Sequence, residues 1–122
     1  MDDEYQYDCA SADIELLARV VSDLFPEQTQ FIERLGEDGR LSLVIHYVAM
    51  RFGSAARRIA IDIRFDTAAL ARYRAMPPQM HARSYAVLRA YVEAELGSLE
   101  EMYANGETVP RTVEIDIGDE FA

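Results

Sequence analysis

Two copies of the tripeptide Ile-Asp-Ile, centred on Asp62 and Asp116, are the strongest hint of chemistry in this chain of 122 residues. If the two segments are neighbouring strands, both carboxylates lie on the same outer face of a sheet, with Glu114 and Arg64 close by. Paired carboxylates can share a proton or hold a cation, and acid–base sites are built in this way. The interpretation that we favour is a solvated sheet face on which arginines offset the acids across strands.

The two histidines suggest no metal centre. His46 lies in an apolar run and shares its face with valines, which predicts a core histidine satisfied by a hydrogen bond. With Asp62, Arg64 and Asp116 it also forms a candidate polar cluster for a small ligand. His81 begins a helical stripe, and neither histidine has a second His or Cys at a ligand spacing. We therefore expect no metal and no cofactor.

Other motifs of catalysis or phosphate binding are missing from the sequence. There is no Gly-x-Ser-x-Gly elbow. Gly36 and Gly39 enclose two acids, which would repel a phosphate. Arg57 and Arg58 form the only basic doublet, which is either a local site for an anion or, as we favour, charge compensation in an acidic chain. We expect no catalytic residue and a protein that is not an enzyme.

Composition excludes several function classes. The net charge of −10 argues against nucleic-acid binding, which needs clustered Lys or Arg. No apolar run approaches the roughly 20 residues of a membrane span. The acidic N-terminus is unlike a secretory signal, so a cytoplasmic protein is expected. The one cysteine, Cys9, allows no internal disulfide.

Period-two patterning predicts the strands. The segment 41–65 reads as a β-hairpin, and in its second half apolar residues from 59 to 65 alternate with polar or small ones. Its first half is apolar on both faces, as in a strand that is central or covered by a partner. The turn at 36–39 predicts a further strand at 28–35, with a continuation of the first helix as the alternative. The alternation at 112–117 predicts the last strand.

Spacings of three and four residues predict the helices. The first begins after Ser11 and ends near Leu24, and a short one covers 68–75. A longer one runs from about 79 to 104, with a kink or restart expected at Gly97.

These elements define the fold class. The order α-β-β-β-α-α-β predicts an α+β protein, a two-layer sandwich with a four-stranded antiparallel sheet and helices on one face. Residues 1–10 show no period and predict a mobile acidic tail, followed by a single domain at 11–122.

Two resemblances accompany these patterns. The run R-R-I-A-I-D-I-R-F-D at 57–66 and the lysine-free acidic composition resemble uncharacterised small acidic proteins of Burkholderia-type proteobacteria. That resemblance implies a bacterial cytosolic protein of unknown function. Small size, low pI, an amphipathic first helix and three following strands also resemble the dimeric, acidic secretion chaperones of Gram-negative bacteria. Those proteins wrap an unfolded effector segment and have the order α-β-β-β-α-β-β-α, of which this chain matches the first four elements.

Surplus apolar surface points to a partner. Leu16 and Val20 widen the apolar face of the first helix, and with Leu24 they form a candidate interface. We therefore expect a non-enzymatic protein-interaction module whose partner is another protein or a second copy in a homodimer, with no nucleic acid and no membrane. The alternatives are a secretion-chaperone-like protein and a small-ligand binder or minor enzyme that uses a pocket near His46, between the sheet and the helices, with Tyr47 and Asp62 as further polar groups.

Overall fold

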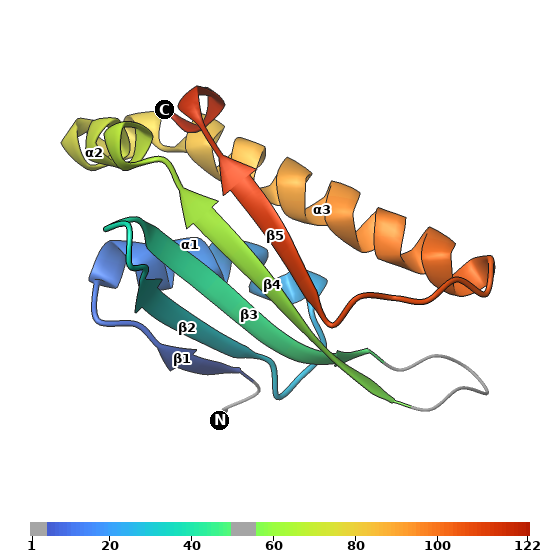
Figure 1. Ribbon diagram of the computed structural model, residues 1–122. Helices are drawn as coiled ribbons and strands as arrows, with labels where there is room; N and C mark the ends of the chain where they lie inside the picture. Colours follow the sequence, from blue (N-terminus) through green and yellow to red (C-terminus); the bar gives the residue numbers. More distant parts are fainter. Residues whose placement is uncertain (1–4, 50–55) are drawn as a thin grey trace.

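A single sheet of five strands, in the order β1-β2-β3-β4-β5, forms the centre of the molecule (Figure 1). The structure is a computed structural model and describes residues 5–49 and 56–122. The strands are β1 (Gln6–Asp8), β2 (Gln30–Leu35), β3 (Leu41–Ala49), β4 (Arg57–Phe65) and β5 (Thr112–Ile117).

The helices form one layer. The helices are α1 (Ala12–Val21), α2 (Thr67–Ala75) and α3 (Ala82–Ala104), with short 3-10 turns η1 (Ser22–Leu24), η2 (Pro78–Met80) and η3 (Asp119–Phe121). Figure 1 shows α1 and α3 against one face of the sheet, with α2 beyond the end of β4. In the described ranges, no helix is both long and apolar enough to span a membrane. The opposite face of the sheet carries none of the helices of the described residues.

Strand direction differs from the expected antiparallel four-stranded sheet. β2, β3 and β4 form the antiparallel meander that the turns predicted, but β1 is parallel to β2 and β5 is parallel to β4. Each parallel pair is joined by a helical crossover, α1 in the first case and α2 with α3 in the second, which returns the chain to the end where it started. Alternation in the sequence reports which face a residue occupies, and it carries no information about direction.

The fifth strand comes from the segment that was expected to be a mobile tail. Residues 6–8 pair with β2, and the ring of Tyr7 stacks on Phe31 at 5.2 Å between centroids. The guanidinium of Arg19 in α1 lies 4.2 Å from the centroid of the same tyrosine ring. Residues 1–4 lie outside the described part of the chain. Three residues are too few for a period-two pattern, which explains why the strand escaped sequence analysis.

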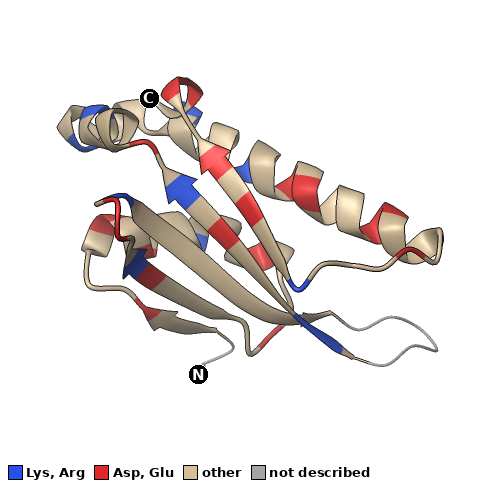
Figure 2. Cartoon of the chain, in the orientation of Figure 1, with Lys and Arg blue, Asp and Glu red and all other residues tan. Residues whose placement is uncertain are grey.

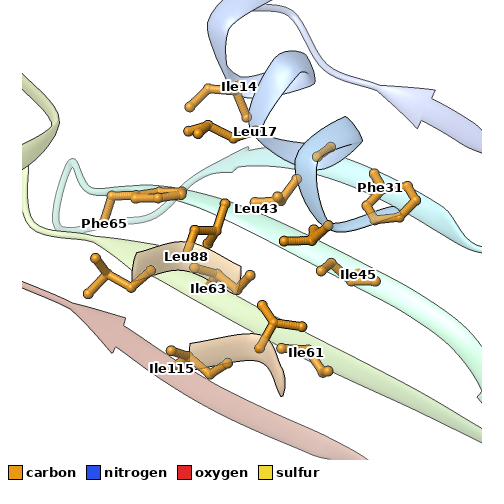
Figure 3. Close-up of a cluster of buried hydrophobic side chains, with 14 of the residues drawn as sticks. Ile14, Leu17, Phe31, Leu43, Ile45, Ile61, Ile63, Phe65, Leu88 and Ile115 are labelled. Carbon is orange, nitrogen blue, oxygen red and sulfur yellow. The ribbon is translucent and has the colours of Figure 1, made fainter. Parts of the chain in front are cut away.

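The core lies between the sheet and the helices. Side chains from four strands and from α1 and α3 converge there, as Figure 3 shows. The fully buried aliphatic positions of β3 and β4 are those predicted by alternation: Leu43, Ile45, Ile59, Ile61 and Ile63. Burying a side chain of this size contributes roughly 1.5–3 kcal/mol, so this row provides much of the stability of the sheet.

Local signals set the ends of the later helices. The side chain of Asp66 accepts a hydrogen bond from the amide of Ala69 at 3.0 Å, which caps α2 as predicted. α3 is unbroken and ends just before Gly106, whose φ of 71° suits a glycine. The expected break at Gly97 does not occur. α3 continues through this exposed glycine, which costs about 1 kcal/mol in helix propensity.

Strand β2 fixes the N-terminus of α1. Ser11 occupies the predicted cap position, but its hydroxyl does not bond to the helix. Instead, the amide and the hydroxyl of Ser11 both donate to the carboxylate of Glu33, at 2.8 and 2.9 Å. This carboxylate lies at the positive end of the helix, where a negative charge is favourable. Glu33 therefore ties the helix layer to the sheet.

We expect Glu33→Ala to lower the free energy of unfolding by about 1–2 kcal/mol, because it leaves two partly buried donors without an acceptor. Urea unfolding followed by circular dichroism measures the change. Glu37→Ala, in the exposed turn between β2 and β3, is the matched control and should have almost no effect. Equal stability of the two variants would contradict the role given to Glu33.

Candidate functional site

The uncovered face of the sheet is the surface on which the polar residues singled out in the sequence lie. Across β3 and β4, Val44 is opposite Asp62, His46 is opposite Ala60 and Val48 is opposite Arg58. These rows of outward residues continue across the sheet onto β2 on one side and β5 on the other. We call this surface the outer face.

A groove of about 660 Å³ opens on the outer face at the end where Val48 and Arg58 lie. Residues from the segment before β2, from β2 itself and from β3 and β4 line it: Pro26, Glu27, Gln28, Gln30, Ile32, His46, Tyr47, Val48, Arg58 and Ile59. Apolar side chains alternate there with amide, imidazole and guanidinium groups. Small-molecule sites have this volume and this mixture of surfaces. We call this feature the His46 groove.

One wall of the groove is a tight turn. Gln28 has a φ of 73°, the only positive value for a non-glycine residue in the described ranges. The hydroxyl of Thr29 donates to the carbonyl of Pro26 at 2.6 Å and closes the turn. Non-glycine residues adopt positive φ infrequently, and such positions are concentrated at binding and active sites. The wall is therefore held in one conformation beside the groove.

His46 differs from the core histidine that was predicted. Its side chain is exposed and lines the groove, because the face of β3 that it shares with Val44 and Val48 is the outer one. The other histidine is structural: the Nε2 atom of His81 lies 3.0 Å from the carbonyl of Tyr73, and the two rings stack at 4.2 Å. A groove does open beside His46, but it lies on the outer face and not between the sheet and the helices, where the pocket was expected, and Asp62 does not line it.

Asp62, Arg64 and Asp116 come together at the other end of the outer face, where Figure 2 shows acidic and basic positions side by side on β4 and β5. Arg64 binds Asp116 through two hydrogen bonds, of 3.0 and 3.1 Å, and reaches Glu114 at 3.4 Å. Arg40 lies 3.4 Å from the same Asp116 carboxylate. His46 takes no part in these bonds.

The register decides how the two aspartates are used. Asp62 is opposite Glu114, and Asp116 is opposite Arg64. The two aspartates are thus not paired with each other. Asp116 binds Arg64, and Asp62 binds Arg34 of β2. No group of three His, Cys, Asp or Glu suited to a metal occurs among residues 5–49 and 56–122. The geometry supports charge compensation across strands as the role of this cluster.

Asp62 is buried to a degree that the sequence did not reveal. The residue is 6% exposed, although it lies on the outer face. Its Oδ2 atom accepts a hydrogen bond from Arg34 at 2.7 Å, while its Oδ1 atom has no hydrogen-bond partner within the described part of the chain. Burial of an ionised carboxylate is costly unless it is paired, so Asp62 depends on Arg34.

The candidate interface on α1 is mostly used internally. Val20 and Leu24 are partly buried and pack against the core, whereas Leu16 is 45% exposed. A single exposed leucine is normal on a protein surface. The apolar width of α1 therefore has an internal explanation, except at Leu16.

Cys9, the residue after β1, carries a partly buried free thiol. Its sulfur lies 3.8 Å from the carbonyl of Phe31, and burial together with the nearby Glu33 carboxylate raises its pKa to about 11. The thiolate is therefore scarce at neutral pH, which makes Cys9 a poor nucleophile.

We expect Arg34→Met to lower the free energy of unfolding by about 1–2 kcal/mol, because it leaves the buried Asp62 carboxylate without its partner. Adding Asp62→Asn should restore part of the loss, since a neutral amide is cheaper to bury. Urea unfolding at neutral pH measures both variants. Arg83→Met, which changes an exposed arginine of α3, is the control, and an equal effect of Arg34→Met and Arg83→Met would refute the dependence.

Comparison with known proteins gives a family and no more. Residues 14–118 match the family model DUF3022, described as a protein of unknown function. No curated protein and no solved structure matches the chain. The matched range includes β2 to β5, α2, α3, all of α1 except its first two residues, and every described residue that lines the His46 groove. The chain belongs to the DUF3022 family.

Proposed function

We propose that the protein is a non-enzymatic binding module and that the His46 groove is where it takes up a small ligand. The observation that carries this proposal is the groove itself, which opens on the one sheet face that no helix covers. Small-molecule binding sites of this volume combine an apolar lining with a few polar groups. Here Ile32 and Val48 supply the apolar surface, and Gln28, His46 and Arg58 supply the polar groups.

The role of a binder, rather than an enzyme, is supported by how the reactive groups are used. The carboxylates nearest to a catalytic arrangement, Asp62 and Asp116, are bound to arginines. Acid–base or nucleophilic chemistry requires a base within hydrogen-bond reach of the group that it activates. His46 has no hydrogen bond to a hydroxyl, thiol or carboxylate in the part of the chain that the structure describes.

Amide NMR with a library of small organic fragments tests the proposal. We expect fragments to shift the amides of residues 26–32, 46–48 and 58–59, because these segments enclose the groove. Ile32→Trp places a bulky indole ring in the groove. It should weaken the binding of those fragments by about tenfold or more, which corresponds to a loss of roughly 1.4 kcal/mol of binding free energy. Sheet positions accept tryptophan well, so the fold should persist.

Leu16→Trp is the matched control, since it puts the same ring on an exposed position of α1, away from the groove. It should leave the fragment affinities unchanged. The proposal fails if no fragment shifts the groove amides, or if Ile32→Trp binds fragments as well as the wild type does.

Self-association through the outer face is a second candidate, and Val48 favours it. This valine is 41% exposed, and the partly exposed Ile32 lines the same groove. The outward positions of the strands carry acids and arginines in near balance: Asp8, Asp62, Glu114 and Asp116 against Arg34, Arg58 and Arg64. In a chain of net charge −10, two copies would repel each other least through such a face. The edges suit pairing less, because β1 is short and β5 carries acids.

Sedimentation velocity at micromolar concentrations separates this candidate from an interface on α1. If the outer face is used, the wild type is a dimer, Val48→Glu is a monomer and Leu16→Glu remains a dimer, because only the first change buries a charge in the interface. The two positions are exposed to nearly the same extent, which makes them a fair pair. A monomeric wild type excludes self-association, and a Leu16→Glu monomer assigns it to α1.

A further inference from the structure

Arginine is the scarce charge in this protein. Acidic residues outnumber basic ones by 22 to 12, and every basic residue is an arginine. Ion pairs with carboxylates hold most of the arginines that the structure describes: Arg19, Arg34, Arg40, Arg64, Arg72, Arg74 and Arg89. The described arginines that form no such ion pair are Arg57, Arg58, Arg83 and Arg111.

Arg58 is such an arginine, and it lines the His46 groove. Its side chain is exposed and forms neither an ion pair nor a hydrogen bond with any residue of the ranges 5–49 and 56–122. The neighbouring Arg57 differs, because it donates to the carbonyl of Val109 at 3.1 Å. Glu27 is the one acid among the described residues that line the groove, and no ion pair joins it to Arg58. The five N–H donors of Arg58 are thus open to a ligand.

We propose that the ligand of the His46 groove is an organic anion, in which an oxyanion is joined to an apolar body. This inference rests on the proposed function and names the class of ligand. The guanidinium fork of Arg58 binds the oxyanion, because its planar donors match a carboxylate, sulfonate or phosphate. The apolar body lies on Ile32 and Val48, which carry no charge to desolvate.

The remaining polar groups of the groove suit the same ligand. The ring N–H of His46 and the side-chain amide of Gln28 are further donors. The Gln30 amide is already partly used, since it donates to Gln6 at 3.1 Å. At physiological ionic strength exposed charges beyond about 8 Å are screened, so that Arg58 acts on a bound anion more strongly than the distant acids of the chain do.

Two fluorescent probes of matched shape test the inference. 8-Anilinonaphthalene-1-sulfonate carries an oxyanion, and N-phenyl-1-naphthylamine has the same aromatic body without it. Both are titrated into the wild type, Arg58→Gln and Arg83→Gln, and amide NMR locates them in the groove. Arg83 is an exposed arginine of α3 outside the groove and provides the control.

We expect Arg58→Gln to weaken the sulfonate by about tenfold, because it removes a charge-assisted bidentate contact. Arg83→Gln should leave that affinity unchanged, and the neutral probe should bind all three proteins alike. Competition by 1-naphthoate and by 1-naphthyl phosphate then shows which oxyanion the groove prefers. Displacement by neither of them would overturn the inference.

The two possible failures can be distinguished. If both probes shift the groove amides and Arg58→Gln binds the sulfonate as well as the wild type does, the groove is a ligand site but not one for anions. If neither probe shifts those amides, the proposed function itself is wrong.

Discussion

One-sided burial is the constraint on which this structure depends. The inward aliphatic row of β3 and β4 packs on α1 and α3, and a chain of this length provides a single layer of helices for that purpose. The second face of the sheet carries none of the described helices, and its side chains range from the exposed His46 and Val48 to the buried Val44 and Asp62. The charged side chains on this face find hydrogen-bond partners on neighbouring strands. At the end where Asp62 and Asp116 lie, these are arginine–carboxylate bonds. Function has to be sought on this face, because it is the broad surface that the core does not use.

The two helical crossovers explain how the layers stay in register. Each crossover makes a parallel strand pair, and each is fixed by a polar tie at a helix N-terminus: Glu33 at α1 and Asp66 at α2. A capping interaction of this kind is worth about 1 kcal/mol, which is small beside the core. The main effect of these interactions is to fix positions. Glu33 joins the start of α1 to β2, and Asp66 joins the start of α2 to the end of β4.

Alternation in the sequence was enough to assign faces. It placed Ile59, Ile61 and Ile63 inward and Asp62 outward, and the glycines at 36 and 39 identified the turn between β2 and β3, while the turn after β3 lies outside the described residues. Three features were beyond its reach. Strand direction depends on crossovers, β1 is too short to show a period, and the buried Asp62 is bound to Arg34, which is distant in sequence. The exposure of His46 was also misjudged, because an apolar strand face was assumed to be a covered one.

The two ends of the outer face differ in how their charges are paired. This difference affects whether ligand binding and self-association could occur on the face at the same time. At one end every charge on β4 and β5 has a partner, so that this end is structural. At the other end Arg58 has none in the described ranges, and Val48 is exposed beside it. A ligand in the groove and a second copy on the outer face would both cover Val48, so they exclude each other. Linkage then requires that a ligand which binds the monomer alone drives dimers apart by mass action. A dimer that persisted with the groove filled would mean that self-association uses another surface.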